Sequence, residues 1–472
     1  MSLKSVISQI PKVQKEFNIF TSYINDTPST NTINDRPLSD KICAIKDNIA
    51  TKDFPTTCAS NVLKTYNSPF DSTVVQLLKK DGAIIIGKTN LDEFGMGSLG
   101  LHTIFEPVKN PLNDNWCIGG SSSGSAAVVA SKMSDFALGT DTGGSVRLPS
   151  AYSAIYGFKP SYGRISRWGV VAFAQSLDTV GILANDIDTI KKVFNTLDKY
   201  DARDPTSLSV ELRNLLKEKS SKVNATDKIK IGIPEEFIQN ELAPEIRQTF
   251  MNYIESLLKQ DKYSIYPVSL PSIKDSLSIY YTLAPAEAAS NLARYDGVRY
   301  GTRDNTKPDI IDGKFFNNSR SNFGPEVKNR IILGNYNLCS EGYQNNFIKA
   351  QKLRVQTINQ FDKIFKFKNI LTDNVPTNNI DFIISPTNLN LPPPINQETK
   401  ASKINPLKEY MNDIFTIPMS LAGIPSISIP FEKGQPHGIQ ICTQYGNDEE
   451  LLKFVKDTVW MSPFFLEFIF ND

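Results

Sequence analysis

GGSSSGSAAVVASKMSDFALGTDTGGSVRL, residues 119–148, is the stretch of sequence that decides the fold. Two clusters of small residues, 119–125 and 139–145, flank a short apolar run. Small residues let backbone amides approach a ligand, and glycine admits backbone angles that other residues resist. One interpretation is two turns around a buried helix. The other is a catalytic site, because serines in such clusters serve as nucleophiles or proton carriers.

Strands and helices alternate around this stretch. We expect a buried strand within 40–50, a helix over 72–80 with Ser72 as its N-cap, and a second buried strand over 82–87. An apolar strand, a helix and another apolar strand predict a βαβ unit with a parallel sheet. The central stretch adds a helix over 124–132, whose amino end favours negative charge, and a strand that begins at residue 136.

A polar linker is expected over about 201–228, between a first half at about 40–200 and a second half at about 228–472 of one single domain. Apolar periodicity and turn residues predict the elements of the second half. These are strands at 228–233, 382–385, 426–429 and 438–441, helices at 245–260 and 448–459, and a long helical segment at 324–368. Residues 303–322 are polar and are expected to form an exposed loop.

The composition excludes several classes of protein. The 472 residues are 40% hydrophobic and 21% charged, with a net charge of +1, so no global basic field attracts nucleic acid. Five scattered cysteines without a C-x-x-C pair argue for a reducing compartment and against zinc, and we expect no metal site. Only two histidines occur, which directs any nucleophilic mechanism toward a lysine base. Runs of apolar residues are too short for a membrane span.

The N-terminus carries Lys4, Lys12 and Lys15 before its first acidic residue, Glu16. This mildly basic segment has two interpretations that the sequence leaves open, a weak organelle-targeting segment and an ordinary first helix.

The motifs resemble those of the amidase signature family. The sequence shows G-G-S-S-x-G-S, then G-T-D-T-G-G-S-V-R, with K-D-N upstream. Lys46 precedes Ser121 by 75 residues, and Ser121 precedes Ser145 by 24, which are the separations expected in that family. The resemblance implies an α/β fold with a large mixed central β-sheet covered by helices on both faces.

The resemblance also implies a division of chemical roles. Ser145 matches the family's nucleophile, Ser121 the bridging serine and Lys46 the base. A lysine accepts a proton near pH 7 only if burial and hydrogen bonds keep it neutral, so we expect Lys46 in a pocket of low dielectric. The backbone amides of Thr142, Gly143, Gly144 and Ser145 match the oxyanion hole.

Segments 291–301, 323–334 and 410–430 resemble the glutamine-hydrolysing components of tRNA-dependent amidotransferases. On the matching positions, Arg330 is expected to bind the α-carboxylate of glutamine and Asp413 its α-amino group, and Tyr280 to line the pocket. The resemblance implies that glutamine is hydrolysed through an ester at Ser145 and that ammonia passes to a B subunit. Glu-tRNA(Gln) is then contacted mainly through that partner.

No cofactor is expected in this chain, because nothing resembles a P-loop, and ATP and magnesium are expected at the B subunit. The candidate partners also include a third, small subunit. Two residues depart from the family pattern: Ser123 stands where relatives usually have glycine, and Leu148 stands where many bacterial relatives have glutamine. Together with an Asn/Lys/Ile-rich composition, these departures indicate a mitochondrial, fungal version of the protein. The cytoplasm is the alternative location. Two other functions stay open, an amidase for another small or fatty amide and a catalytically silent scaffold protein.

Overall fold

The computed structural model describes residues 2–27, 36–220, 228–303, 310–311, 314–315, 320–396, 409–432 and 434–459. An eleven-stranded mixed sheet forms its centre, in the order β1-β3-β2-β6-β8-β7-β14-β15-β13-β9-β10. Its strands are β1 (Phe20–Tyr23), β2 (Ile42–Lys46), β3 (Ile84–Thr89), β6 (Phe136–Asp141), β7 (Tyr156–Lys159), β8 (Thr179–Ala184), β9 (Ile229–Pro234), β10 (Tyr263–Val268), β13 (Phe382–Pro386), β14 (Ser426–Pro430) and β15 (Gly438–Cys442). Two small hairpins, β4 (Lys109–Asn110) with β5 (Asn113–Cys117) and β11 (Ile310–Ile311) with β12 (Lys314–Phe315), lie outside it.

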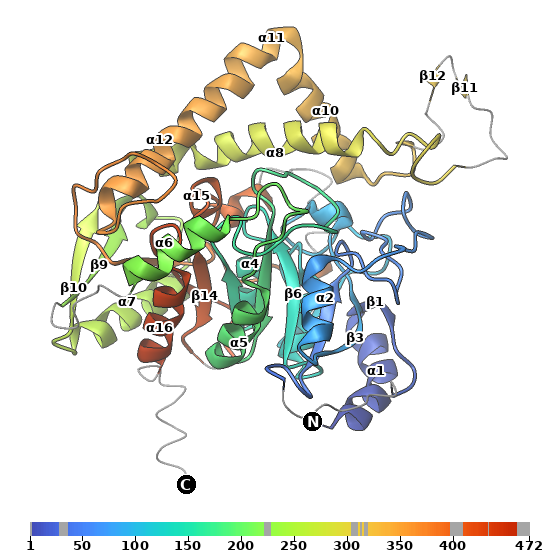
Figure 1. Cartoon of the computed structure of the whole chain (residues 1–472), viewed down its shortest axis with the longest axis horizontal. Coiled ribbons are helices and arrows are strands. Elements are labelled where there is room, and N and C mark those ends of the chain that lie inside the picture. The colour runs from blue at the N-terminus through green and yellow to red at the C-terminus, as the bar shows by residue number, and fades with distance from the viewer. Residues whose placement is uncertain are drawn as a thin grey trace.

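The helices surround this sheet (Figure 1). The α-helices are α1 (Leu3–Phe17), α2 (Thr73–Lys80), α3 (Ser123–Ala130), α4 (Arg147–Tyr152), α5 (Ile187–Leu197), α6 (Val210–Ser220), α7 (Pro244–Leu258), α8 (Ser276–Leu292), α10 (Pro325–Leu338), α11 (Ser340–Gly342), α12 (Lys349–Ile364), α15 (Ile417–Leu421) and α16 (Asp448–Val459). Short 3-10 turns are η1 (Glu93–Gly95), η2 (Glu235–Phe237), η3 (Pro271–Asp275) and η5 (Met411–Asp413), and η4 (Tyr343–Ile348) is a π-helical segment.

The βαβ prediction is confirmed. Strands β2 and β3 pair in parallel, with α2 between them in the chain. The side chain of Ser72 accepts a hydrogen bond from the backbone N–H of Val75, as an N-cap does. The sheet becomes mixed beyond this unit, because β6 pairs in parallel with β2 but antiparallel with β8.

Alternate residues of the central strands pack into different cores on the two faces of the sheet. Cys43 and Ile45 of β2 pack with α2, α5, α7 and α16, whereas Ile42 and Ala44 pack with α1 and α3. This is the period of two that a strand buried on both faces requires. The expected covering of both faces by helices is therefore confirmed.

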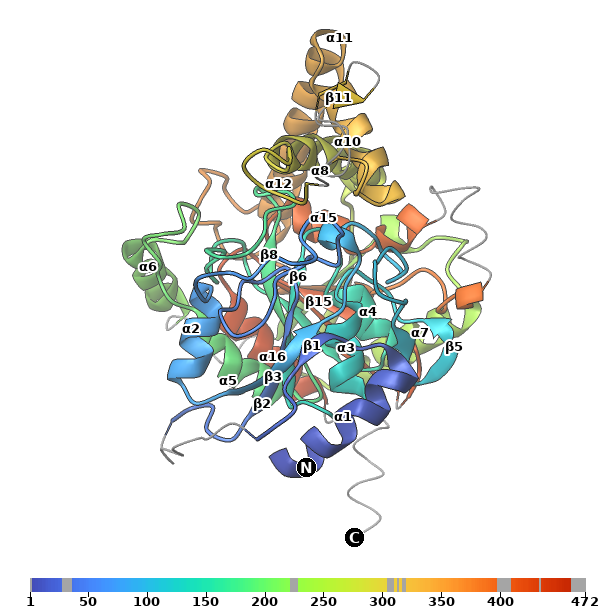
Figure 2. The ribbon, with the colours of Figure 1, turned by 90° about the vertical axis from the view of Figure 1, so that its right-hand side faces the viewer.

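A layer of helices lies across one end of the sheet, formed by α8, α10 and α12 (Figure 1), and Figure 2 shows it as a narrow projection. Helices α8 and α10 approach closely at Gly334, where a Cβ atom would lie 2.0 Å from the carbonyl oxygen of Pro285. The long helical segment expected over about 324–368 is helical over most of its length, but it is not one continuous helix. The chain turns at Cys339, whose backbone is extended (φ −67°, ψ 159°), and continues through α11 and η4 into α12.

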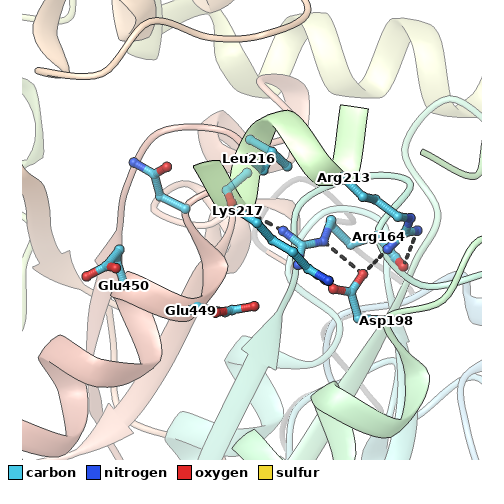
Figure 3. Close-up of a pocket in the computed structure, with 9 residues that line it drawn as sticks. Arg164, Asp198, Arg213, Leu216, Lys217, Glu449 and Glu450 are labelled. Carbon is cyan, nitrogen blue, oxygen red and sulfur yellow. Dashed lines mark hydrogen bonds and ion pairs between the residues drawn. The ribbon is translucent and has the colours of Figure 1, made fainter. Parts of the chain in front are cut away.

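Part of the expected linker is anchored to the body by buried charges. Arg213 of α6 and Arg164 both form ion pairs with Asp198 (Figure 3). Arg164 also contacts Asp448. The guanidinium of Arg213 further donates to three backbone carbonyls, those of Gly163, Arg164 and Lys199. The first part of the segment is therefore ordered structure, and its residues 221–227 lie outside the described residues.

A second buried arginine connects the two halves of the chain. Arg147, at the start of α4, is fully buried and forms a bidentate pair with Asp141 at the end of β6, at 3.0 and 2.8 Å. Its guanidinium also donates to the carbonyl of Thr416, to the hydroxyl of Ser420 and to Oε1 of Gln440, at 2.7–2.8 Å. One side chain from the first half thus holds an α-helix and a strand of the second half.

We predict that Arg147→Met lowers the free energy of unfolding by about 3–5 kcal/mol, because it leaves the buried Asp141 without its counter-charge. Urea unfolding followed by tryptophan fluorescence measures the change. Lys456→Met is the matched control, because it breaks the exposed pair of Lys456 with Asp188, whose side chains are 49% and 56% exposed. The control substitution should lower the free energy of unfolding by less than about 1 kcal/mol. Equal costs for the two variants contradict the prediction.

Candidate active site

Lys46 is fully buried at the carboxyl end of β2. Its Nζ lies 2.8 Å from Oγ of Ser121 and 2.9 Å from Oγ of Ser122, and it contacts the hydroxyl of Thr140 at 3.0 Å. Asn48 donates to the same Thr140 hydroxyl at 3.0 Å. The amine is therefore surrounded by hydroxyls and has no carboxylate as a direct partner among the described residues.

Burial lowers the pKa of Lys46 to about 7. The charges of Asp92, Asp141 and Asp178 act in the opposite direction but do not cancel the cost of desolvation. A substantial share of Lys46 is consequently neutral at physiological pH, with a lone pair available to accept a proton from a hydroxyl 2.8 Å away.

The two small-residue clusters meet at the amino ends of α3 and α4. The peptide bond between Gly120 and Ser121 is cis, and the backbone N–H of Ser122 donates to the carbonyl of Ser145 at 3.1 Å. Ser145 is 8% exposed, and its hydroxyl makes no hydrogen bond within the described part of the chain. The structure therefore joins Lys46 to Ser121 directly and places Ser145 in the adjoining turn, without a hydrogen bond between the two serine hydroxyls.

The loop at residues 141–145, called the nucleophile loop because it carries the candidate nucleophile Ser145, is held from two sides. The hydroxyl of Thr142 donates to Asp178 at 2.8 Å, and Asp178 also accepts the backbone N–H groups of Phe173 and Ala174 at 3.0 and 3.1 Å. On the other side, Arg147 donates to the carbonyl of Gly143 at 3.1 Å. Fixed backbone amides are what an oxyanion hole requires, because they stabilise charge without reorganising.

The two glycines of this loop leave room for side chains of the second half. A Cβ atom on Gly143 would lie 2.9 Å from Cζ of Tyr280, and one on Gly144 would lie 2.9 Å from Oδ1 of Asp413 and 2.2 Å from Oγ1 of Thr416. Tyr280 and Asp413 therefore border the loop that carries Ser145.

Arg330 lies in α10 and is buried among aromatic rings. Its guanidinium lies 5.5–5.7 Å from the ring centroids of Phe173, Tyr281 and Tyr410, and its Nε donates to Glu326 at 2.7 Å. Its Nη1 and Nη2 make no hydrogen bond to any described residue. A substrate carboxylate that enters the space between these rings can accept hydrogen bonds from both Nη1 and Nη2.

Asp413, in η5, lies close enough to Arg330 for the charge of the guanidinium to affect the pKa of its carboxyl group. Burial raises the pKa of Asp413 to about 7, with the charges of Asp141 and Glu409 acting in the same direction. The hydrogen bond from Ser98 and the charge of Arg330 lower it. A carboxylate that borders the 141–145 loop thus lies within electrostatic range of a buried cation, and this pair of charges complements an amino acid.

Several residues of the site were not predicted. Thr140 and Asn48 surround Lys46, Asp178 holds Thr142, and Ser98 holds Asp413. Asn48 belongs to the K-D-N motif and Thr140 to the G-T-D-T-G-G-S-V-R motif, and both could have been found there, whereas Asp178 and Ser98 depend on contacts between distant segments. Glu93 lies in the stretch TNLDEFGMG, residues 89–97, where the sequence allows a site carboxylate but favours a position on a loop surface, and the expected surface position is wrong.

In the structure Glu93 is buried, and its carboxylate accepts the hydroxyl of Ser60 at 2.5 Å and the backbone N–H of Gly324 at 2.7 Å. These bonds tie η1 to the segment that precedes α10, so Glu93 supports the site from beneath. Across the described ranges, no three His, Cys, Asp or Glu side chains gather in a group that could hold a metal ion. None of the helices in that part of the chain is both long enough and apolar enough to span a bilayer.

Comparisons with known proteins agree with this geometry. Residues 3–452 match the family described as Amidase. The chain is 50% identical over 460 residues to the A component of the mitochondrial Glutamyl-tRNA(Gln) amidotransferase of Eremothecium gossypii, covering 96% of this chain and 97% of that protein. It is 43% identical to the Candida albicans protein of the same name, covering 94% and 96%.

A solved structure extends the comparison to bacteria. The crystal structure of the A component of Glutamyl-tRNA(Gln) amidotransferase from Thermotoga maritima superposes with a TM-score of 0.77 at 30% identity, covering 98% of this chain and 91% of that chain. The structure of 6-aminohexanoate cyclic dimer hydrolase, at 18% identity and a TM-score of 0.77, shares the fold. The chain therefore belongs to the amidase family.

Proposed function

We propose that this protein is the glutamine-hydrolysing A component of a mitochondrial Glu-tRNA(Gln) amidotransferase. Its nearly full-length identity of 43–50% to fungal mitochondrial proteins of that name supports the activity and the location. The observation that carries the proposal is that Asp413 borders the loop of Ser145 and lies within electrostatic range of the buried cation Arg330, because a simple amide substrate needs neither a cation nor a carboxylate for its recognition.

The acylation step uses the buried lysine. The Ser145 hydroxyl passes its proton to Ser121, and Ser121 passes its own to Nζ of Lys46, while Oγ of Ser145 attacks the carbonyl carbon of the glutamine side-chain amide. The backbone amides of the loop around Gly144 stabilise the oxyanion. Lys46 returns the proton through Ser121 to the leaving nitrogen, and the C–N bond breaks to release ammonia.

The deacylation step uses the same groups in the reverse sense. A water molecule loses a proton through Ser121 to Lys46 and attacks the glutamyl ester at Ser145. The ester bond breaks, Oγ of Ser145 regains the proton, and glutamate leaves. In this proposal Lys46 is the only base, so both half-reactions depend on its neutral form.

As one component of an amidotransferase, the protein works with partner proteins. We propose that ammonia passes to a B subunit, which binds ATP and magnesium and contacts Glu-tRNA(Gln), and that a third, small subunit completes the complex. The net charge of +1 supports this division, because the chain has no global basic field for tRNA.

The Ser145 variant tests the nucleophile. We predict that Ser145→Ala lowers glutamine hydrolysis by about a thousandfold or more in the assembled complex. A diazoketone analogue of glutamine should label the wild-type chain at Ser145, as seen by peptide mass spectrometry. Ser153→Ala is the matched control, because its buried hydroxyl has no hydrogen-bond partner in the described residues. Full glutaminase activity in Ser145→Ala contradicts the mechanism.

The pH profile tests the base. The pKa of Lys46 is lowered to about 7 and only the neutral amine accepts a proton, so kcat/KM for glutamine should rise as pH increases through about 7. Asp413, with its pKa raised to about 7, must be ionised to bind an ammonium group and steepens the same rise. Glutaramate, which is glutamine without its α-amino group, should show the shallower rise of Lys46 alone. A flat profile between about pH 6 and 8 contradicts this assignment.

The Arg330 variant tests the substrate. Arg330→Ala should reduce kcat/KM for glutamine by about 30- to 1000-fold, mainly through KM, because the α-carboxylate loses a bidentate, charge-assisted partner. Arg354→Ala is the matched control, since that partly buried arginine of α12 donates to Ser176 and to the carbonyl of Leu421 rather than to the site. Unchanged KM and turnover in Arg330→Ala favour an amidase for another amide.

A further inference from the structure

Ser98 is a buried residue that connects two carboxylates of the second half. Its hydroxyl donates to Oδ2 of Asp413 at 2.5 Å, and its backbone N–H donates to Oε1 of Glu409 at 2.9 Å. These partners are 315 and 311 residues away in the chain. A serine hydroxyl has a single proton to donate, so the orientation of the Asp413 carboxylate depends on where Ser98 is held.

Glu409 is itself fixed by an ion pair. Its Oε2 lies 3.1 Å from Nε2 of His102, and the Glu409 side chain is only 4% exposed. Burial acts to lower the pKa of His102, but the hydrogen bond and the charge of Glu409 outweigh it and raise that pKa to about 9. His102 is therefore cationic at neutral pH, and it balances the charge of Glu409 beside Asp413.

The segment that carries Ser98 and His102 is held by a third carboxylate. Asp92 accepts the backbone N–H of His102 at 2.9 Å and that of Gly100 at 3.1 Å. This segment is thus tied to the loop before η1 and, through Glu409, to the start of η5. Two distant parts of the chain are locked together directly beneath Asp413.

The free oxygen of Asp413 faces the substrate side. With Oδ2 bound by Ser98, Oδ1 lies beside Gly144, where a Cβ atom would be 2.9 Å away, and it makes no hydrogen bond within the described residues. An ammonium group at this point meets an oriented acceptor next to the nucleophile loop.

We propose that Glu409 and His102 are positioning residues for amino-acid recognition: they hold Ser98 so that its hydroxyl aims the carboxylate of Asp413 at the α-ammonium group of the substrate. This inference rests on the proposed function, because it takes Asp413 as the partner of that ammonium. Glu409 supplies the anchor for Ser98, and His102 fixes that anchor through its contact with Oε2 of Glu409.

The test compares L-glutamine with glutaramate in the assembled complex. The two substrates share the amide and the carboxylate, so the ratio of their kcat/KM values reports recognition of the α-amino group. Glu409→Ala and Ser98→Ala should each reduce this ratio by about tenfold, through a higher KM for glutamine, because a charged acceptor loses its orientation. The kcat/KM for glutaramate should stay within about twofold of the wild-type value.

Conservative variants distinguish a loss of positioning of Asp413 from a general loss of structure. Glu409→Gln keeps an acceptor for the Ser98 N–H and should restore the ratio to within about threefold of wild type. His102→Gln should reduce the ratio of the two kcat/KM values by less than Glu409→Ala does. Asp198→Asn disturbs a buried ion-pair cluster away from the site (Figure 3) and should leave the ratio unchanged.

The outcomes distinguish this inference from the proposed function. If Asp413→Asn reduces the ratio and Glu409→Ala does not, or if Glu409→Ala lowers both kcat/KM values equally, the positioning role is overturned. If the wild-type complex hydrolyses glutaramate as well as glutamine, or if Asp413→Asn leaves the ratio unchanged, Asp413 does not bind the amino group and the proposed substrate recognition is overturned with it.

Discussion

The buried contact between Arg147 and Asp141 is the constraint on which the rest of the structure depends. Asp141 ends β6 and begins the nucleophile loop, and Arg147 follows that loop at the start of α4. The pair closes the loop, and the remaining donors of the guanidinium reach Thr416, Ser420 and Gln440. Thr416 directly precedes α15 and Ser420 lies within it, and both follow Asp413 closely in the chain. The loop that carries Ser145 and the segment that carries Asp413 are consequently held by one cation.

Two buried lysines at the ends of neighbouring strands differ in the groups that their amines contact. Lys88 of β3 and Lys46 of β2 are both fully buried. Lys88 has a carboxylate partner, Asp47, at 3.0 Å. Lys46 has only hydroxyls and a carbonyl within reach, so desolvation dominates and favours the neutral amine. A buried lysine without a counter-charge is costly for stability, and that cost is consistent with a functional role.

Much of the fold could be predicted from the sequence, because apolar periodicity and turn residues are local signals. The strands β2, β3 and β6 and the N-cap at Ser72 follow directly from them. The break at Cys339 could not be predicted, since no proline or glycine marks it. The motifs also placed Lys46, Ser121 and Ser145 in one region. Ser98, Asp178 and Glu409 escaped prediction because their partners are set by tertiary contacts, some across more than 300 residues.

The bare backbone of the nucleophile loop has an evolutionary consequence. At Gly143 and Gly144 the space that a side chain would need is filled by Tyr280, Asp413 and Thr416, so the loop presents only main-chain atoms to a substrate from these positions. In the proposed function, selectivity then depends on residues of α8, α10 and η5, outside the core of the sheet. Mutational drift in those elements can redirect the enzyme to another amide while the hydrolytic apparatus is inherited unchanged. Such an architecture lets a lineage diversify its substrates and conserve a single reaction.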